Sequence, residues 1–192
     1  MNLWLRLLTT LLLARRRGAL ALPAGVSVLH FRVWPHDLDL SLHMNNGRYL
    51  TLMDLGRLDV LVRCGLWRAV GRNGWTPIAS AIKIRFRREM HLFDRFRLET
   101  RLVAWDKLFV VMEQVFVLDR GPHAGTVAAQ ALFKGGLYDR SARQFVPIAQ
   151  LMQEIGIAPE GPPLTREVEA FLDADEALKQ SRSVSRRAAE LQ

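Results

Sequence analysis

The sequence predicts an α+β domain in which an antiparallel sheet wraps around one long, buried helix. An apolar-rich segment at residues 45–63 has helical spacing, and strand-like alternation precedes it once and follows it four times. One long helix followed by consecutive strands is typical of the α+β class rather than of alternating α/β folds. At 192 residues, of which 49% are hydrophobic, the chain is long enough to form one domain with a full core.

Periodicity and end signals place each element. Residues 26–34 alternate as a strand that Pro35 ends, and Asn45-Asn46 supplies N-cap chemistry for the helix, with Gly65 placed as its C-cap. Apolar residues leave little of the helix circumference polar, which predicts burial on most sides. After a connecting segment, strand signals follow at residues 78–88, 94–104, 108–118 and 126–138.

Both ends of the chain differ in composition from the central domain at residues 25–158. The extension at 1–24 is rich in leucine and then carries Arg15-Arg16-Arg17, but it falls short of the roughly 20 apolar residues of a spanning helix. The charge follows the apolar run, which disfavours a secretory signal. We expect residues 1–17 either to contact a membrane interface or to dock on the protein's own surface. In residues 159–192 the spacing of apolar residues predicts one weakly amphipathic helix, which a Ser/Arg-rich tail follows.

Net charge and cysteine content indicate the cellular compartment of the protein and the chemistry of its partners. Twenty-seven Lys and Arg against nineteen Asp and Glu give a net charge of +8, which favours a partner that carries phosphate groups. The single cysteine, Cys64, excludes an intramolecular disulfide and makes a reducing, cytoplasmic compartment the simplest setting. We expect no nucleic-acid partner, because the sequence contains none of the usual reading modules.

The most concentrated polar set precedes the long helix and comprises Asp37, Asp39, His43, Asn45 and Asn46. Unpaired N–H groups at a helix start stabilise developing negative charge, and here a carboxylate accompanies them. Composition alone favours their interpretation as helix caps. Their order therefore has to decide between the two interpretations.

That order resembles the signature of hotdog-fold acyl-CoA thioesterases of the 4-hydroxybenzoyl-CoA thioesterase type. The matching run is Asp39-Leu40-Ser41-Leu42-His43-Met44-Asn45-Asn46-Gly47-Arg48-Tyr49, followed by Asp54 and Arg57, and a weaker match spans residues 26–148. The resemblance implies a hotdog fold, a homodimer or tetramer with active sites at subunit interfaces, and hydrolysis of an acyl or aroyl thioester. It implies no metal and no cofactor, since coenzyme A enters as part of the substrate.

The resemblance also implies roles for individual residues. Asp39 stands at the catalytic carboxylate, which either activates water as a general base or attacks the thioester carbonyl as a nucleophile. The backbone N–H of Asn46 stands where the family polarises that carbonyl, and His43 braces the loop or orients groups by hydrogen bonding. The expected substrate-contacting residues are Asn45, Tyr49, Asp54, Arg85 and Arg87, with Asp54 also pairing with Arg57. His36 and Asp37 fit a solvated loop face.

Basic residues alternate on two consecutive predicted strands, as Lys83, Arg85 and Arg87 and then as Arg95, Arg97 and Arg101. If these strands pair, the two rows of charge lie side by side. The rows then either bind the phosphates of coenzyme A or form a solvated outer face.

Two other functions stay open. The family usually carries glycine, which permits unusual backbone angles, where this chain has Leu42. That departure and the Leu/Arg extension favour a non-catalytic acyl-CoA-binding or membrane-associated hotdog protein. An enoyl-CoA hydratase is disfavoured, because those enzymes carry Asp, Asn and His in that order, whereas His43 precedes Asn45 here.

Overall fold

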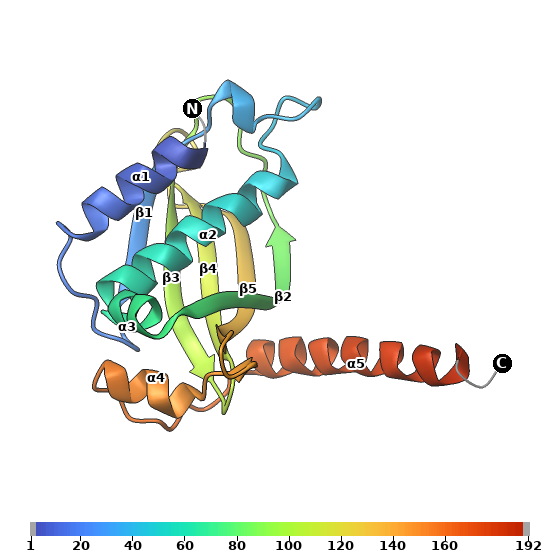
Figure 1. The fold of residues 1–192 in the computed structure, drawn as a ribbon. Coiled ribbons are helices and arrows are strands. Elements are labelled where there is room, and N and C mark those ends of the chain that lie inside the picture. The colour runs from blue at the N-terminus through green and yellow to red at the C-terminus, as the bar shows by residue number, and fades with distance from the viewer. Residues whose placement is uncertain (1–2, 190–192) are drawn as a thin grey trace.

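The computed structural model describes residues 3–189 and shows a six-stranded antiparallel sheet that curls around one long helix (Figure 1). The strand order is β1-β3-β4-β5-β2, with β6 paired to β5. The strands are β1 (Val26–Arg32), β2 (Trp75–Phe86), β3 (Arg95–Trp105), β4 (Val110–Leu118), β5 (Val127–Asp139) and β6 (Gln144–Phe145). The helices are α1 (Leu3–Ala14), the 3₁₀ turn η1 (Pro35–Asp37), α2 (Asn46–Arg63), α3 (Leu66–Asn73), α4 (Ile148–Glu154) and α5 (Arg166–Ala189). The predicted α+β class is confirmed.

Helix α2 is the helix that the sheet encloses. The side chain of Asn45 caps it by accepting a hydrogen bond from the N–H of Gly47 at 2.8 Å. At the other end the C-cap is Cys64, and the predicted cap Gly65 lies one residue later, where its φ of +90° separates α2 from α3. Most of the circumference of α2 is buried or half-buried, as predicted, and only Asn46, Gly47, Leu50 and Asp54 are exposed.

A glycine lets α2 approach the sheet closely. A Cβ at Gly56 would overlap Thr100 Oγ1 and come within 3.0 Å of Gln114 Nε2. Gln114 is fully buried and donates from Nε2 to the Met53 carbonyl at 2.9 Å and to Thr100 Oγ1 at 3.1 Å. Arg57 donates from Nη1 to Gln114 Oε1 at 2.7 Å. Hydrogen bonds beneath the helix therefore fix its position on the sheet.

The strand order separates β2 from β3, so these consecutive strands do not pair. β2 pairs with β5, and both β4 and β5 lie between it and β3. The two predicted rows of charge are therefore not adjacent, because the chain crosses the sheet between these strands. Arg97 and Arg101 instead pair locally, with Glu99 and Glu113, each at 2.6 Å from the arginine Nε.

Two short helices fill segments for which no helix was predicted. α3 follows α2 directly, and α4 follows β6. Ala69 and Val70 of α3 belong to the same buried cluster as Leu151 and Met152 of α4. With eight and seven residues, α3 and α4 are shorter than the window of about 11–18 residues over which helical periodicity is read from a sequence.

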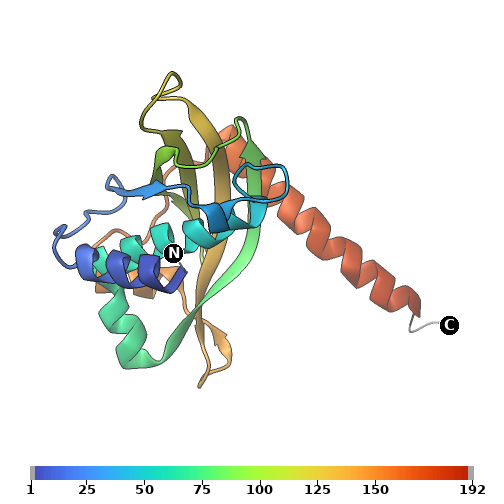
Figure 2. The ribbon, with the colours of Figure 1, turned by 90° about the horizontal axis from the view of Figure 1, so that it is seen from above.

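The predicted C-terminal helix is present as α5, and it continues to Ala189 through the Ser/Arg-rich segment that was predicted as a tail. Val168 and Phe171 near its start pack against Ala104 and Val111 on the outer face of the sheet. Beyond these residues α5 extends away from the sheet (Figure 2).

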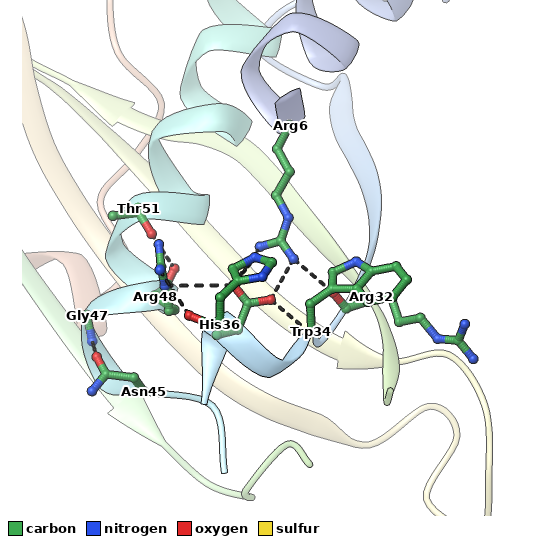
Figure 3. Close-up of polar contacts among 9 residues, drawn as sticks. Arg6, Arg32, Trp34, His36, Asn45, Gly47, Arg48 and Thr51 are labelled. Carbon is green, nitrogen blue, oxygen red and sulfur yellow. Dashed lines mark hydrogen bonds and ion pairs between the residues drawn. The ribbon is translucent and has the colours of Figure 1, made fainter. Parts of the chain in front are cut away.

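Helix α1 docks on the domain through one face. Leu3 and Leu7 pack against the main core, and Arg6 is only 4% exposed. Its guanidinium donates to both carboxylate oxygens of Asp37, at 3.0 and 2.6 Å, and to the carbonyl of Arg32 at 3.0 Å (Figure 3). This face of the extension therefore docks on the protein itself. Among residues 3–189, none of the helices combines the length and the apolar character needed to span a bilayer.

We expect Gly56→Ala to lower the free energy of unfolding by about 2 kcal/mol, because extra volume in a close-packed contact costs about 1–3 kcal/mol. Urea denaturation measures the change. Gly71→Ala in α3 is the matched control, since a Cβ there meets nothing within 4 Å. The control should gain about 0.5–1 kcal/mol from helix propensity. Equal changes in the two variants would contradict the close approach at Gly56.

Candidate active site

The loop between η1 and α2 holds Asp39 and His43 in a tight turn. The Asp39 N–H donates to the His43 carbonyl at 3.0 Å, and the Leu42 N–H donates to the Asp39 carbonyl at 3.1 Å. Leu42 closes the turn with a φ of +60°, in the left-handed region. The turn brings the Asp39 carboxylate to 3.5 Å from Nδ1 of His43.

The Asp39 carboxylate is partly exposed, with 27% of its side chain accessible to solvent. Its Oδ1 accepts a hydrogen bond from the N–H of Ser41 at 2.9 Å, and its Oδ2 faces His43. One oxygen is therefore held by the loop, while the other can meet a proton donor or an electrophile. A carboxylate in this state can act as a general base or as a nucleophile.

The start of α2 lies next to this loop in sequence, and both Asn45 and Asn46 are exposed there. The Asn45 side chain is used as the cap on Gly47. The backbone N–H of Asn46, the first residue of α2, has no acceptor within the helix and lies at the positive end of the helix dipole. This amide is suited to polarise a carbonyl oxygen.

Tyr49 lies in the core rather than at the surface of the site. It is only 2% exposed, and its ring packs edge-on against Phe86 and Phe116 at centroid distances of 5.0 Å. Burial, together with the charge of Glu89, raises the pKa of Tyr49 to about 12. In the single chain Tyr49 therefore packs beneath the start of α2. It is not exposed to a substrate there, as its predicted role in substrate contact would require.

Asp37 is buried, which corrects its assignment to a solvated loop face. Only 1% of it is exposed, and besides both donors from Arg6 it accepts a hydrogen bond from the N–H of Trp34 at 2.9 Å. Its backbone carbonyl accepts from the N–H of Asn45 at 2.9 Å. Figure 3 shows Arg48 approaching from α2, and its Nε lies 3.7 Å from Asp37 Oδ1. No local pattern predicts this, because Arg6 lies 31 residues away in sequence.

An apolar cavity of about 400 Å³ lies between α2 and strands β2 and β5. Asp54 and Arg57 line it and form the predicted ion pair with each other. The Arg57 guanidinium also lies 4.0 Å from the centroid of the Phe133 ring, and burial lowers the pKa of Arg57 although Asp54 opposes this shift. The apolar lining includes Leu58, Leu61, Cys64, Ile78, Phe133, Leu137, Met152 and Ile155. Such a cavity fits an apolar group whose polar end meets the ion pair.

Arg85 and Arg87 are exposed near the end of β2, and Arg87 Nη2 donates to Gln130 Oε1 at 3.3 Å. The segment that follows β2 contacts the Asp39 loop directly. His91 forms an isolated bridge with His43. The structure therefore brings the end of β2 towards the loop through backbone pairing.

Across residues 3–189, no three His, Cys, Asp or Glu side chains are arranged to hold a metal ion.

Known proteins share sequence with this chain. Protein THEM6 of Xenopus laevis is 41% identical over 85 residues, which are 44% of this chain and 41% of that protein. Protein THEM6 of Drosophila melanogaster is 28% identical over 145 residues, 75% of this chain and 70% of that protein. The match to the frog protein thus spans less than half of its length.

Solved structures share the fold. The probable thioesterase YbaW from Escherichia coli has a TM-score of 0.61 at 23% identity, covering 67% of this chain and 95% of that one. Slr0204, a 1,4-dihydroxy-2-naphthoyl-CoA thioesterase from Synechocystis, has a TM-score of 0.58 at 14% identity, covering 68% and 95%. The predicted hotdog fold is confirmed.

The family model of the thioesterase-like superfamily matches residues 33–155. This range runs from the end of β1 through α4 and includes both the Asp39 loop and the cavity behind α2. Because the match covers more than half of its residues, the chain belongs to the thioesterase-like superfamily.

Proposed function

We propose that the protein hydrolyses an acyl-CoA thioester to the free acid and CoA, with Asp39 as the catalytic carboxylate. The observation that carries the proposal is the partly exposed Asp39 carboxylate, held by a tight turn directly before α2. Membership of the thioesterase-like superfamily supports the reaction class. No metal or redox cofactor is needed for the steps below.

In the general-base route, Asp39 takes a proton from water as the water oxygen attacks the thioester carbonyl. The resulting oxyanion receives a hydrogen bond from the N–H of Asn46, strengthened by the dipole of α2. The C–S bond then breaks, and the CoA thiolate takes up a proton. In the nucleophilic route, Asp39 displaces CoA to form an anhydride, which water hydrolyses. His43 orients the Asp39 carboxylate in both routes, and Asn45 positions the helix start as its cap.

The cavity behind α2 is the proposed site for the acyl or aroyl group, because almost its entire lining is apolar. Asp54 and Arg57 supply its polar end. Arg85 and Arg87 are proposed to bind phosphates of the CoA moiety, since both are exposed and lie near the strand end that leads to the Asp39 loop. The cytoplasmic setting stays a prediction.

A homodimer through β2 is part of this proposal, with the tetramer as a further stage of assembly. β2 has the free edge at one side of the sheet, and it exposes Ile78, Ile82 and Phe86 by 37%, 37% and 42%. Long, exposed apolar edge strands pair readily with a second chain. Because β2 also lines the acyl cavity, a paired copy would adjoin the site.

The first prediction of the proposal concerns Asp39→Asn. Loss of a positioned base or nucleophile should lower kcat by about 100-fold or more, while the fold remains intact. Free CoA release from short, long and aromatic acyl-CoAs measures the effect, and Asp173→Asn in α5 is the control for loss of an exposed carboxylate. Near-normal turnover by Asp39→Asn would refute its role.

Wild-type acyl-CoA binding without cleavage would support the non-catalytic alternative, and hydration of an enoyl-CoA without cleavage would support a hydratase.

Leu42 gives the second prediction, because a left-handed backbone costs a residue with a Cβ about 1–2 kcal/mol. We expect Leu42→Gly to be as stable as the wild type and to keep its turnover, because relief of this strain offsets the greater backbone entropy that glycine has in the unfolded chain. Leu42→Val should be less stable than Leu42→Gly and should lower kcat, since a β-branched residue fits this conformation poorly. Arg143, with a φ of +53° in a remote turn, offers Arg143→Val as a control that affects stability alone. Full turnover by Leu42→Val would show that the turn does not position Asp39.

The third prediction concerns pairing through β2. Sedimentation equilibrium of the wild type should give the mass of two or four chains. Ile82→Asp, which places like charges from two copies along the paired edge, should shift the mass towards one chain. Leu178→Asp, at an equally apolar but remote exposed site, should leave the mass unchanged. A monomeric wild type with full turnover would remove the dimer from the proposal and keep the chemistry.

A further inference from the structure

The face of α1 that points away from the domain is apolar and uncovered. Trp4, Leu5, Leu8 and Leu12 are 72%, 50%, 53% and 57% exposed. Trp4, Leu8 and Leu12 follow one another at intervals of four residues, so they form a single stripe along the helix. Together these four residues are called the outer stripe below. Contiguous exposed apolar surface of this kind marks an interaction site.

The orientation of the outer stripe is fixed by the opposite face of α1. Leu3 and Leu7 pack into the core, and the Arg6 guanidinium is held by both oxygens of the buried Asp37. Turning the helix to bury the outer stripe would expose these contacts and leave the Asp37 charge buried without its partner, which is costly. The outer stripe is therefore held on the solvent-facing side of α1.

Basic residues lie at the C-terminal end of α1 and in a groove beside it. Arg15, Arg16 and Arg17 follow α1 directly and are exposed, and residues 1–24 contain no Asp or Glu. A groove of about 400 Å³ runs along α1 beside β1 and is lined by Arg17, His30, Arg32 and Arg95 among others, of which Arg17 pairs with Asp59 and His30 with Asp119. Arg32 and Arg95 are direct cross-strand partners. Like charges placed opposite each other are unfavourable unless an anion offsets them.

The place of α1 in the fold leaves the outer stripe free in the proposed dimer. α1 lies over β1 at one edge of the sheet, and β2 lies at the other edge (Figures 1 and 2). Pairing through β2 therefore does not cover α1. With 12 residues α1 is too short to cross a bilayer, but an amphipathic helix of this length can lie within the interface.

We propose that the outer stripe docks on an anionic phospholipid bilayer. Trp4, Leu8 and Leu12 enter the boundary between headgroups and acyl chains, and Arg15 and Arg16 contact the headgroup phosphates. The apolar stripe supplies the area buried, and the arginines supply the preference for anionic lipid. This inference does not rest on the proposed hydrolysis.

Co-sedimentation of the full chain with vesicles tests the proposal. The wild type should pellet with vesicles of equal parts phosphatidylcholine and phosphatidylglycerol, and much less with phosphatidylcholine alone. Leu8→Gln combined with Trp4→Ala should weaken binding by about 100-fold or more, because two large apolar side chains no longer insert. Arg15→Glu with Arg16→Glu should weaken binding to the mixed vesicles by about tenfold or more, because two contacts with headgroup phosphates are lost.

Matched controls separate docking from general stickiness. Leu178→Gln removes an equally exposed leucine from α5, and Arg140→Glu removes an exposed arginine from the turn after β5, and both should bind as the wild type does. All variants should keep wild-type circular dichroism and lipid-free CoA release, because the substituted residues are exposed and outside the Asp39 site.

Three outcomes would overturn the proposal. In the first, the wild type stays in the supernatant with the mixed vesicles. In the second, the Trp4→Ala, Leu8→Gln variant pellets as the wild type does. In the third, sedimentation equilibrium in buffer shows that this variant has fewer chains per particle than the wild type, which would assign the outer stripe to a second copy of the chain.

Discussion

The buried carboxylate of Asp37 joins the parts of the molecule on which the candidate site depends. This carboxylate accepts hydrogen bonds from Arg6 of α1 and from the backbone N–H of Trp34, just after β1. The backbone carbonyl of Asp37 accepts a hydrogen bond from the N–H of Asn45, the N-cap of α2. A buried charge is tolerated only when its partners are complete, and loss of one partner typically costs about 3–5 kcal/mol. Asp37 precedes Asp39 by two residues. The contacts that satisfy the buried carboxylate therefore also set the start of the Asp39 loop.

Two further buried polar groups hold α2 from below and behind. Gln114 joins β4 to the helix beneath Gly56, through the Met53 carbonyl and Arg57. Asp59 is fully buried and accepts from Ser27 Oγ at 2.6 Å, with Arg63 Nη1 at 3.2 Å. The helix is thus fixed in height and rotation by hydrogen bonds rather than by apolar packing alone. A fixed helix start is what an amide needs in order to stabilise charge without reorganising.

The fold also separates three kinds of contact in space. β2 and the cavity behind α2 lie on one side of the sheet, the Asp39 loop lies at the start of α2, and α1 lies over the opposite edge. The ion pair between Arg6 and Asp37 connects that outer helix to the loop, so the two regions are mechanically joined although they face different surroundings.

Features that depend on neighbouring residues can be predicted from the sequence alone. The periodicity of residues 45–63, the cap at Asn45 and the strand alternation set the elements, and the run from Asp39 to Tyr49 identified the candidate loop. The packing of the whole chain, in contrast, separates β2 from β3, buries Tyr49 in the core and pairs Arg6 with Asp37. These outcomes depend on which distant surfaces pack together. Local periodicity sets which face of an element is apolar, but the partner of that face is chosen by the packing of the whole chain.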